Sequence, residues 1–185
     1  MKFLKTLPVL FFLTVGFLRA QSGTIDLKSH GALDIFLEER WTVSVSEFDR
    51  VIVKIVPKDE TTNADMELTI TFPEQDRFAQ KAKLRSQVEL NGRRFELGSV
   101  EGKSIARELN SSAGGGYYCN FTDPELVGKP PQKGNFKTIS IGMIRVAPDV
   151  LIEFAIQADG FRDKAYQELL GALEGMEYKP RRGAR

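Results

Sequence analysis

Residues 136–157, FKTISIGMIRVAPDVLIEFAIQ, and residues 161–176, FRDKAYQELLGALEGM, decide the fold class. The first stretch predicts a hairpin of two strands, 136–146 and 150–157, around a turn at 147–149. Its second strand alternates so that one face carries Val150, Ile152, Phe154 and Ile156. The second stretch predicts an amphipathic helix, whose apolar residues at spacings of three or four are Phe161, Ala165, Leu169, Leu173 and Met176. Because such a helix must cover a sheet, the two stretches indicate an α+β fold.

Alternating apolar residues extend this sheet toward the N-terminus. We predict a short strand at 24–27 and a hairpin or bent strand pair around a turn at 38–40, with its apolar positions at Leu33, Ile35, Leu37, Trp41, Val43 and Val45. Residues 51–56, VIVKIV, predict a central strand, and Pro73 ends a further strand that includes residues 68–72. Short turns between adjacent strands predict a mostly antiparallel sheet.

The middle of the chain gives mixed signals. Residues 75–87 are rich in helix formers and predict a helix. Asn91 and Gly92, flanked by apolar residues at every second position, predict a short strand or turn within 88–97. A strand at 104–110, a flexible stretch at 111–116, a strand at 117–121 and a loop at 122–134 follow.

The first 20 residues predict a secretory signal peptide. Lys2 and Lys5 precede an apolar stretch at 7–18, and Ala20 offers a small residue at the cleavage point. A membrane anchor takes roughly 20 apolar residues, so we expect removal, and no later segment is apolar enough to span a bilayer. We therefore predict a signal peptide at 1–20, a single α+β domain at 21–178 and a basic disordered tail at 179–185.

Charge and cysteine content narrow the class of protein. Beyond residue 20 the chain holds 23 basic and 25 acidic residues, which argues against nucleic acid as the main partner. Cys119 is the only cysteine, so no internal disulfide can form. An exported chain without disulfides favours the bacterial periplasm, or secretion, as its destination.

One resemblance extends over the mature chain. Residues 31–37, GALDIFL, lead into residues 40–43, RWTV, and a long hairpin followed by a helix closes the chain. This order of elements resembles the Mog1/PsbP-like fold, an antiparallel sheet with helices packed on it, which includes exported bacterial members of unknown role. The resemblance implies a non-catalytic binding or accessory role, and it transfers no functional residues.

Catalytic and metal-binding chemistry has little support in the sequence. His30 is the only histidine and has Cys119 as its only soft companion, so we expect no metal site, no catalytic residues and no cofactor. Cys119 lies on the apolar face of its strand, which predicts a buried, inert thiol. Trp41 is expected in the core.

The most distinctive surface signal is a run of glycines followed by two tyrosines. We predict a binding site formed by Gly114, Gly115, Gly116, Tyr117, Tyr118 and Asp123, because glycines and tyrosines are common at recognition surfaces. The expected function is that of an exported, soluble, non-enzymatic domain that binds another envelope protein. Two alternatives remain: a carrier that holds an apolar ligand in a cavity under the 161–176 helix, and a hydrolase with two acids in a deep cleft.

Overall fold

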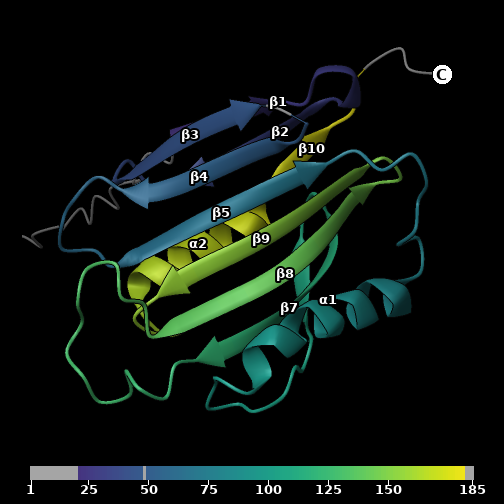
Figure 1. Ribbon diagram of the computed structural model, residues 1–185. Coiled ribbons are helices and arrows are strands. Elements are labelled where there is room, and N and C mark those ends of the chain that lie inside the picture. Colours follow the sequence, from purple (N-terminus) through teal and green to yellow (C-terminus); the bar gives the residue numbers. More distant parts are fainter. Residues whose placement is uncertain (1–20, 48, 182–185) are drawn as a thin grey trace, which may run out of the picture.

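The computed structural model describes residues 21–47 and 49–181 (Figure 1). Seven strands form one large sheet in the order β3-β4-β5-β9-β8-β7-β6, and three form a small sheet in the order β1-β2-β10. The large-sheet strands are β3 (Trp41–Glu47), β4 (Val51–Pro57), β5 (Ala64–Thr71), β6 (Arg107–Ser111), β7 (Gly114–Thr122), β8 (Thr138–Ala147) and β9 (Val150–Ala158). All neighbouring strands are antiparallel, which confirms the predicted α+β class with a mostly antiparallel sheet.

The inner face of the large sheet is covered by helix α2 (Lys164–Gly175) and by the small sheet. The small sheet consists of β1 (Gln21–Asp26), β2 (Ala32–Leu37) and β10 (Glu177–Lys179), with the 3-10 helix η1 (Lys28–His30) between its first two strands. The predicted faces of β9 and α2 meet here, and Ile152, Leu169 and Leu173 are completely buried. Each such side chain contributes about 1.5–3 kcal/mol relative to exposure.

Residues 21–47 and 49–181 cover the outer face on one flank only. Helix α1 (Lys81–Glu96) packs on β7 and β8 (Figure 1), where Leu84 and Val88 join Cys119, Phe121 and other apolar residues in a second core cluster. Farther along the same face, Lys54 and Val56 of β4 are exposed to solvent. The sheet is therefore enclosed on its inner side and half open on its outer side.

Helix α1 corrects the prediction for residues 75–97. The helix begins at Lys81 and continues through Asn91 and Gly92 to Glu96, so the strand or turn predicted within 88–97 is wrong. Leu84, Val88 and Gly92 recur at a spacing of four and are the buried residues of the helix. Gly92 serves close packing rather than a turn, because a Cβ there would lie 2.5 Å from the Ser104 hydroxyl oxygen and 3.0 Å from the Phe121 ring.

Of the two arrangements predicted for residues 33–45, a hairpin or a bent strand pair, the hairpin is wrong. β2 belongs to the small sheet and pairs with β1 and β10, whereas β3 begins the large sheet and pairs with β4. The chain bends at Glu38, whose carbonyl oxygen accepts a hydrogen bond from the Trp41 amide. The turn predicted at 38–40 thus joins two sheets instead of closing a hairpin.

The stretch predicted to be flexible, 111–116, is a tight hairpin. Ser111 pairs with Gly114 as β6 turns into β7, and the Ser112 amide donates to the carbonyl oxygen of Glu174. This hairpin end is therefore tied to the last residues of α2.

The structure corrects the prediction for part of the C-terminal tail, and it does not describe the two ends of the chain. Lys179, assigned from the sequence to a disordered tail, is the last residue of β10 and forms an ion pair with Asp34 of β2. The predicted signal peptide, 1–20, and residues 182–185 lie outside the described residues. Within the described part, no helix is both long and apolar enough to cross a membrane.

Candidate functional site

A hollow lies where α1 meets the open half of the outer sheet face, and we call it the α1 groove. Its walls and floor include Glu67, Thr69, Asn91, Arg94, Met143 and Glu153, and it encloses about 170 Å³. A wider hollow of about 940 Å³ continues it toward residues 71–78 and shares Asn91, Arg94, Met143 and Glu153. A third hollow also includes Arg94, which places this arginine at the junction of all three.

Strand register brings the two acids of the groove together. Thr69 of β5 lies opposite Glu153 of β9, and Glu67 lies opposite Ala155. Opposed side chains in an antiparallel pair share a face, so Glu67 and Glu153 are diagonal neighbours. The Cα atoms of such neighbours are about 7–8 Å apart. Arg94 comes from the flank of α1, in line with residues 88 and 91 at a helical spacing of three.

The polar groups of the groove differ in whether they already have partners within the protein. Glu67 pairs with Lys54 at 3.3 Å, and the Asn91 side-chain amide contacts the sulfur of Met143 at 3.6 Å. Arg94 lies 4.9 Å from the centre of the Phe95 ring. Among the described residues, neither Arg94 nor Glu153 has an ion-pair partner. Both charges are therefore available to a ligand.

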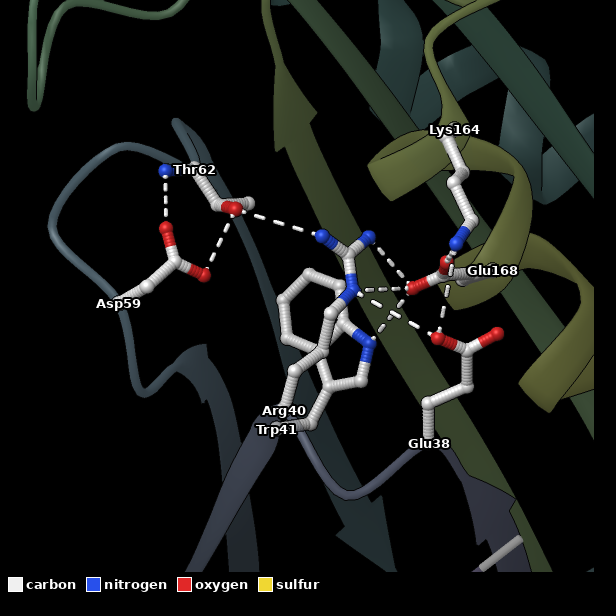
Figure 2. A network of polar contacts seen from close by, with 7 residues as sticks. All are labelled: Glu38, Arg40, Trp41, Asp59, Thr62, Lys164 and Glu168. Carbon is white, nitrogen blue, oxygen red and sulfur yellow. Dashed lines mark hydrogen bonds and ion pairs between the residues drawn. The ribbon is translucent and has the colours of Figure 1, made fainter. Parts of the chain in front are cut away.

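A second polar feature, the Glu168 cluster, joins the β2–β3 turn to α2 (Figure 2). Its residues are Glu38, Arg40, Trp41, Asp59, Thr62, Lys164 and Glu168. The Arg40 Nε donates to Glu168 Oε2 at 2.7 Å, and the Trp41 indole donates to the same oxygen at 3.0 Å. Thr62, held by Asp59 at 2.9 Å, accepts from Arg40 at 3.3 Å.

The Glu168 cluster is structural rather than a binding site. Burial raises the pKa of Glu168, but the hydrogen bonds from Arg40 and Trp41 outweigh burial and bring the pKa below its ordinary value. The carboxylate is thus held charged by two donors to its Oε2 and by the Lys164 ammonium 3.4 Å from its Oε1, and its side chain is only 14% exposed. Trp41 is 2% exposed, which confirms its expected place in the core.

The structure distributes the predicted glycine–tyrosine site along β7. Tyr117 packs against the cluster under α1, whereas Tyr118 packs against the core on the opposite face of the sheet. Both tyrosines are half-buried, and Gly115 is exposed. Asp123 follows the far end of the strand, roughly 27 Å from Gly115 at about 3.4 Å per residue. The predicted residues therefore do not converge on one patch, although Asp123 lines the third hollow.

Close packing against β8 accounts for two of these glycines. A Cβ on Gly114 would overlap the carbonyl oxygen of Arg145, and one on Gly116 would lie 2.9 Å from the carbonyl oxygen of Met143. Gly115, in contrast, has open space around it. The glycine run therefore reflects backbone contact at positions 114 and 116 rather than flexibility.

The thiol and the imidazole lie in separate environments. Cys119 is completely buried under α1, and burial raises its pKa to about 11, as an inert thiol requires. His30 stacks on Phe72 at 4.2 Å and contacts Asp149 through Nδ1 at 2.7 Å. No group of three or more metal-ligating side chains occurs in the residues that the structure describes.

Sequence reasoning missed Arg94 and Glu153. Arg94 falls in a segment predicted as a strand or turn, so its place on a helix flank was not foreseen. Glu153 is an outward residue of a correctly predicted strand, and nothing local marks it as different from other exposed glutamates. One signal for the groove was available in the sequence. It was the polar residues on the outward face of 68–72 and of 150–157, which come together on one surface only if these two strands pair.

Comparison with known proteins adds no family. No protein-family model matches the chain, and no curated protein matches its sequence.

Proposed function

We propose that this protein is an exported, non-enzymatic binding domain of the bacterial envelope, and that the α1 groove binds an extended basic segment of a partner protein. One observation carries the proposal: Arg94 and Glu153, two charges without ion-pair partners among the described residues, line a hollow on the open half of the sheet. A ligand segment lying along α1 would bring basic side chains to Glu153 and Glu67. Arg94 would then donate to backbone carbonyl oxygens of the segment.

The charge of the groove favours a basic partner. Acidic residues outnumber basic ones around the first two hollows, with Asp49, Glu67, Glu74 and Glu153 against Arg77 and Arg94. The wider hollow also offers apolar contact through Leu90, which is 52% exposed. An amphipathic segment fits this combination, and its affinity should fall as salt rises, because the charges are close to solvent.

Export and fold family are part of the proposal. The pattern of residues 1–20 supports a signal peptide and a periplasmic or secreted location, which mass spectrometry of the exported protein tests directly. The early GALDIFL strand and the order of elements support membership of the Mog1/PsbP-like fold, whose implied role is also binding. Superposition of the sheet on members of that fold tests this part.

A second function is favoured by one feature of the groove. Glu67 and Glu153 are diagonal neighbours on one face of the sheet, and glycosidases use a pair of carboxyl groups that flank the substrate. Hydrolysis of a panel of chromogenic glycosides that is lost in Glu153→Gln would establish the enzyme and overturn the non-enzymatic proposal. Nothing comparable favours the apolar carrier, because Leu169 and Leu173 of α2 pack directly into the core with no exposed surface.

A peptide-display selection tests the proposed binding. The full chain is panned with random peptides, and selected peptides are then measured against Glu153→Lys and against Glu177→Lys. Glu177 is an exposed glutamate on a strand outside the groove, so it controls for a general loss of negative charge. We expect basic peptides whose affinity falls about tenfold or more in Glu153→Lys and is kept in Glu177→Lys. Equal binding to both variants would overturn the proposal.

A further inference from the structure

Strand β3 is an edge strand of the large sheet. It ends the strand order, and no strand among the described residues pairs with its outer side. Its seven residues, WTVSVSE, contain no proline, lysine or arginine. The opposite edge, β6, is shorter, carries Arg107 and Glu108, and continues into the turn that is tied to α2. Proteins blunt sheet edges with short strands and charges of this kind, whereas β3 is longer than β6 and its one charged residue, Glu47, lies at its end and pairs with Lys28.

The register with β4 shows which backbone groups of β3 face outward. The Lys58 amide donates to the carbonyl oxygen of Arg40 at 2.8 Å, and the pairing then runs without a shift from Trp41 opposite Pro57 onward. Hydrogen-bonded and non-hydrogen-bonded pairs alternate along an antiparallel ladder. Thr42, Ser44 and Ser46 therefore bond to β4. The backbone groups of Val43 and Val45 point away from the sheet.

The side chains of β3 form a self-complementary pattern. Val43 and Val45 lie on the inner side of the strand yet remain 38% and 46% exposed. Thr42, Ser44 and Ser46 lie on the outer side. Centred on Ser44, the sequence TVSVS has a valine on each side of the serine, followed on each side by a hydroxyl residue.

We propose that two copies of this chain pair through β3, antiparallel about a two-fold axis at Ser44, and join their large sheets into one. Val43 of each copy then lies opposite Val45 of the other, and Thr42 lies opposite Ser46. The outward backbone groups of the valines become hydrogen-bonded, and the exposed valine surface is buried. Glu47 faces Trp41 of the second copy, so no like charges oppose each other.

A second copy fits this edge better than an unrelated strand does. The two-fold register pairs valine with valine on one face and hydroxyl residue with hydroxyl residue on the other, and it spans all seven residues of β3. It also places Ser44 opposite itself in a non-hydrogen-bonded pair, with Cα atoms about 4.5 Å apart. This separation lies within the range of about 4.4–6.8 Å that a disulfide bridges.

Cysteine cross-linking tests the register. In the full chain, Ser44→Cys should form a disulfide-linked dimer under mild oxidation. Ser46→Cys should not, because the two Ser46 residues are offset by four positions, about 13 Å along the strands. The native Cys119 is completely buried and does not contribute. Cross-linking of Ser46→Cys as rapid as that of Ser44→Cys would overturn the proposed register.

Sedimentation velocity tests the association itself. The full chain should be a dimer, and Val45→Lys should weaken self-association about tenfold or more by placing a charge at the pairing edge. Val56→Lys is the matched control, because Val56 is similarly exposed, at 41%, but lies on β4. A full chain that stays monomeric throughout a concentration series would overturn the proposal, as would equal loss of dimer in both lysine variants.

Discussion

Replacing Glu168 by alanine should destabilise the fold more than the loss of any exposed ion pair would. The carboxylate receives the Arg40 and Trp41 donors on one oxygen, and an Arg40 Nη2 lies 2.5 Å from that oxygen. Because β2 and β3 belong to different sheets, this contact fixes the corner between them to α2. The variant leaves the Trp41 indole without its acceptor and the Arg40 guanidinium without its main counter-charge.

The expected loss follows from these contacts. Hydrogen bonds to a charged acceptor contribute about 1.5–3 kcal/mol, and the partial exposure of Arg40, 28%, reduces their sum. We expect Glu168→Ala to cost about 3 kcal/mol of unfolding free energy. For a domain of this size, that loss corresponds to roughly 6–12 °C in Tm. Glu168→Gln keeps an acceptor and should cost about half as much.

Urea unfolding followed by fluorescence measures this loss directly, because Trp41 is the only tryptophan and belongs to the cluster. Glu108→Ala, which removes an exposed ion pair with Lys81, is the control and should leave the midpoint nearly unchanged. A Glu168→Ala midpoint indistinguishable from that of Glu108→Ala would refute the structural role of the cluster.

The stabilisation by Glu168 should also depend on pH. Burial raises its pKa, but the Arg40 and Trp41 donors bring it below the ordinary value of 4.5. A lowered folded-state pKa means that the contribution is complete above pH 4.5 and is lost as the pH falls through the folded-state pKa. The stability gap between the wild type and Glu168→Ala should therefore narrow in acid, and a gap that widens would contradict the assignment.

Three further outcomes are expected. Gly142→Ala should lower stability by about 1–3 kcal/mol in thermal melts, because its methyl group would overlap β7 backbone and an aromatic ring, whereas Gly115→Ala has open space and should be nearly neutral. The Cys119 thiol should resist a thiol reagent at pH 8 in the native protein and react once urea unfolds it; rapid native labelling would contradict its burial. Asp34→Asn should lower the unfolding midpoint at neutral pH but not in strong acid, because hydrogen bonds, that from Lys179 foremost, hold the pKa of Asp34 below 3.8.

The elements that the sequence predicts well are those with strong local periodicity. The hairpin at 136–157 and the helix within 161–176 each bury a face whose spacing is visible in a few residues. Helix α1 was predicted in part only, because Asn91 and Gly92 resemble a turn locally while Gly92 is selected by its contact with Phe121. At this position the local sequence favours a turn, whereas packing against distant residues favours the helix, and the structure has the helix.

Features that depend on distant residues were not predictable from a single chain segment. The change of sheet between β2 and β3 rests on Glu168, more than 120 residues away in sequence. Arg94 and Glu153 line the same hollow only because α1 packs on β7 and β8, beside β9 in the strand order. The glycines and tyrosines of β7 predicted a binding site by their composition, yet the two tyrosines lie on opposite faces of the sheet.

Hydrogen–deuterium exchange of the full chain, with and without a selected basic peptide, shows whether the α1 groove is the binding site. We expect slower exchange along α1 around Asn91 and Arg94 and on β9 around Glu153, with no change at the β6–β7 hairpin. A selection that yields no basic peptide, or protection confined to that hairpin at Gly114 and Gly115, would contradict the α1 groove as the binding site.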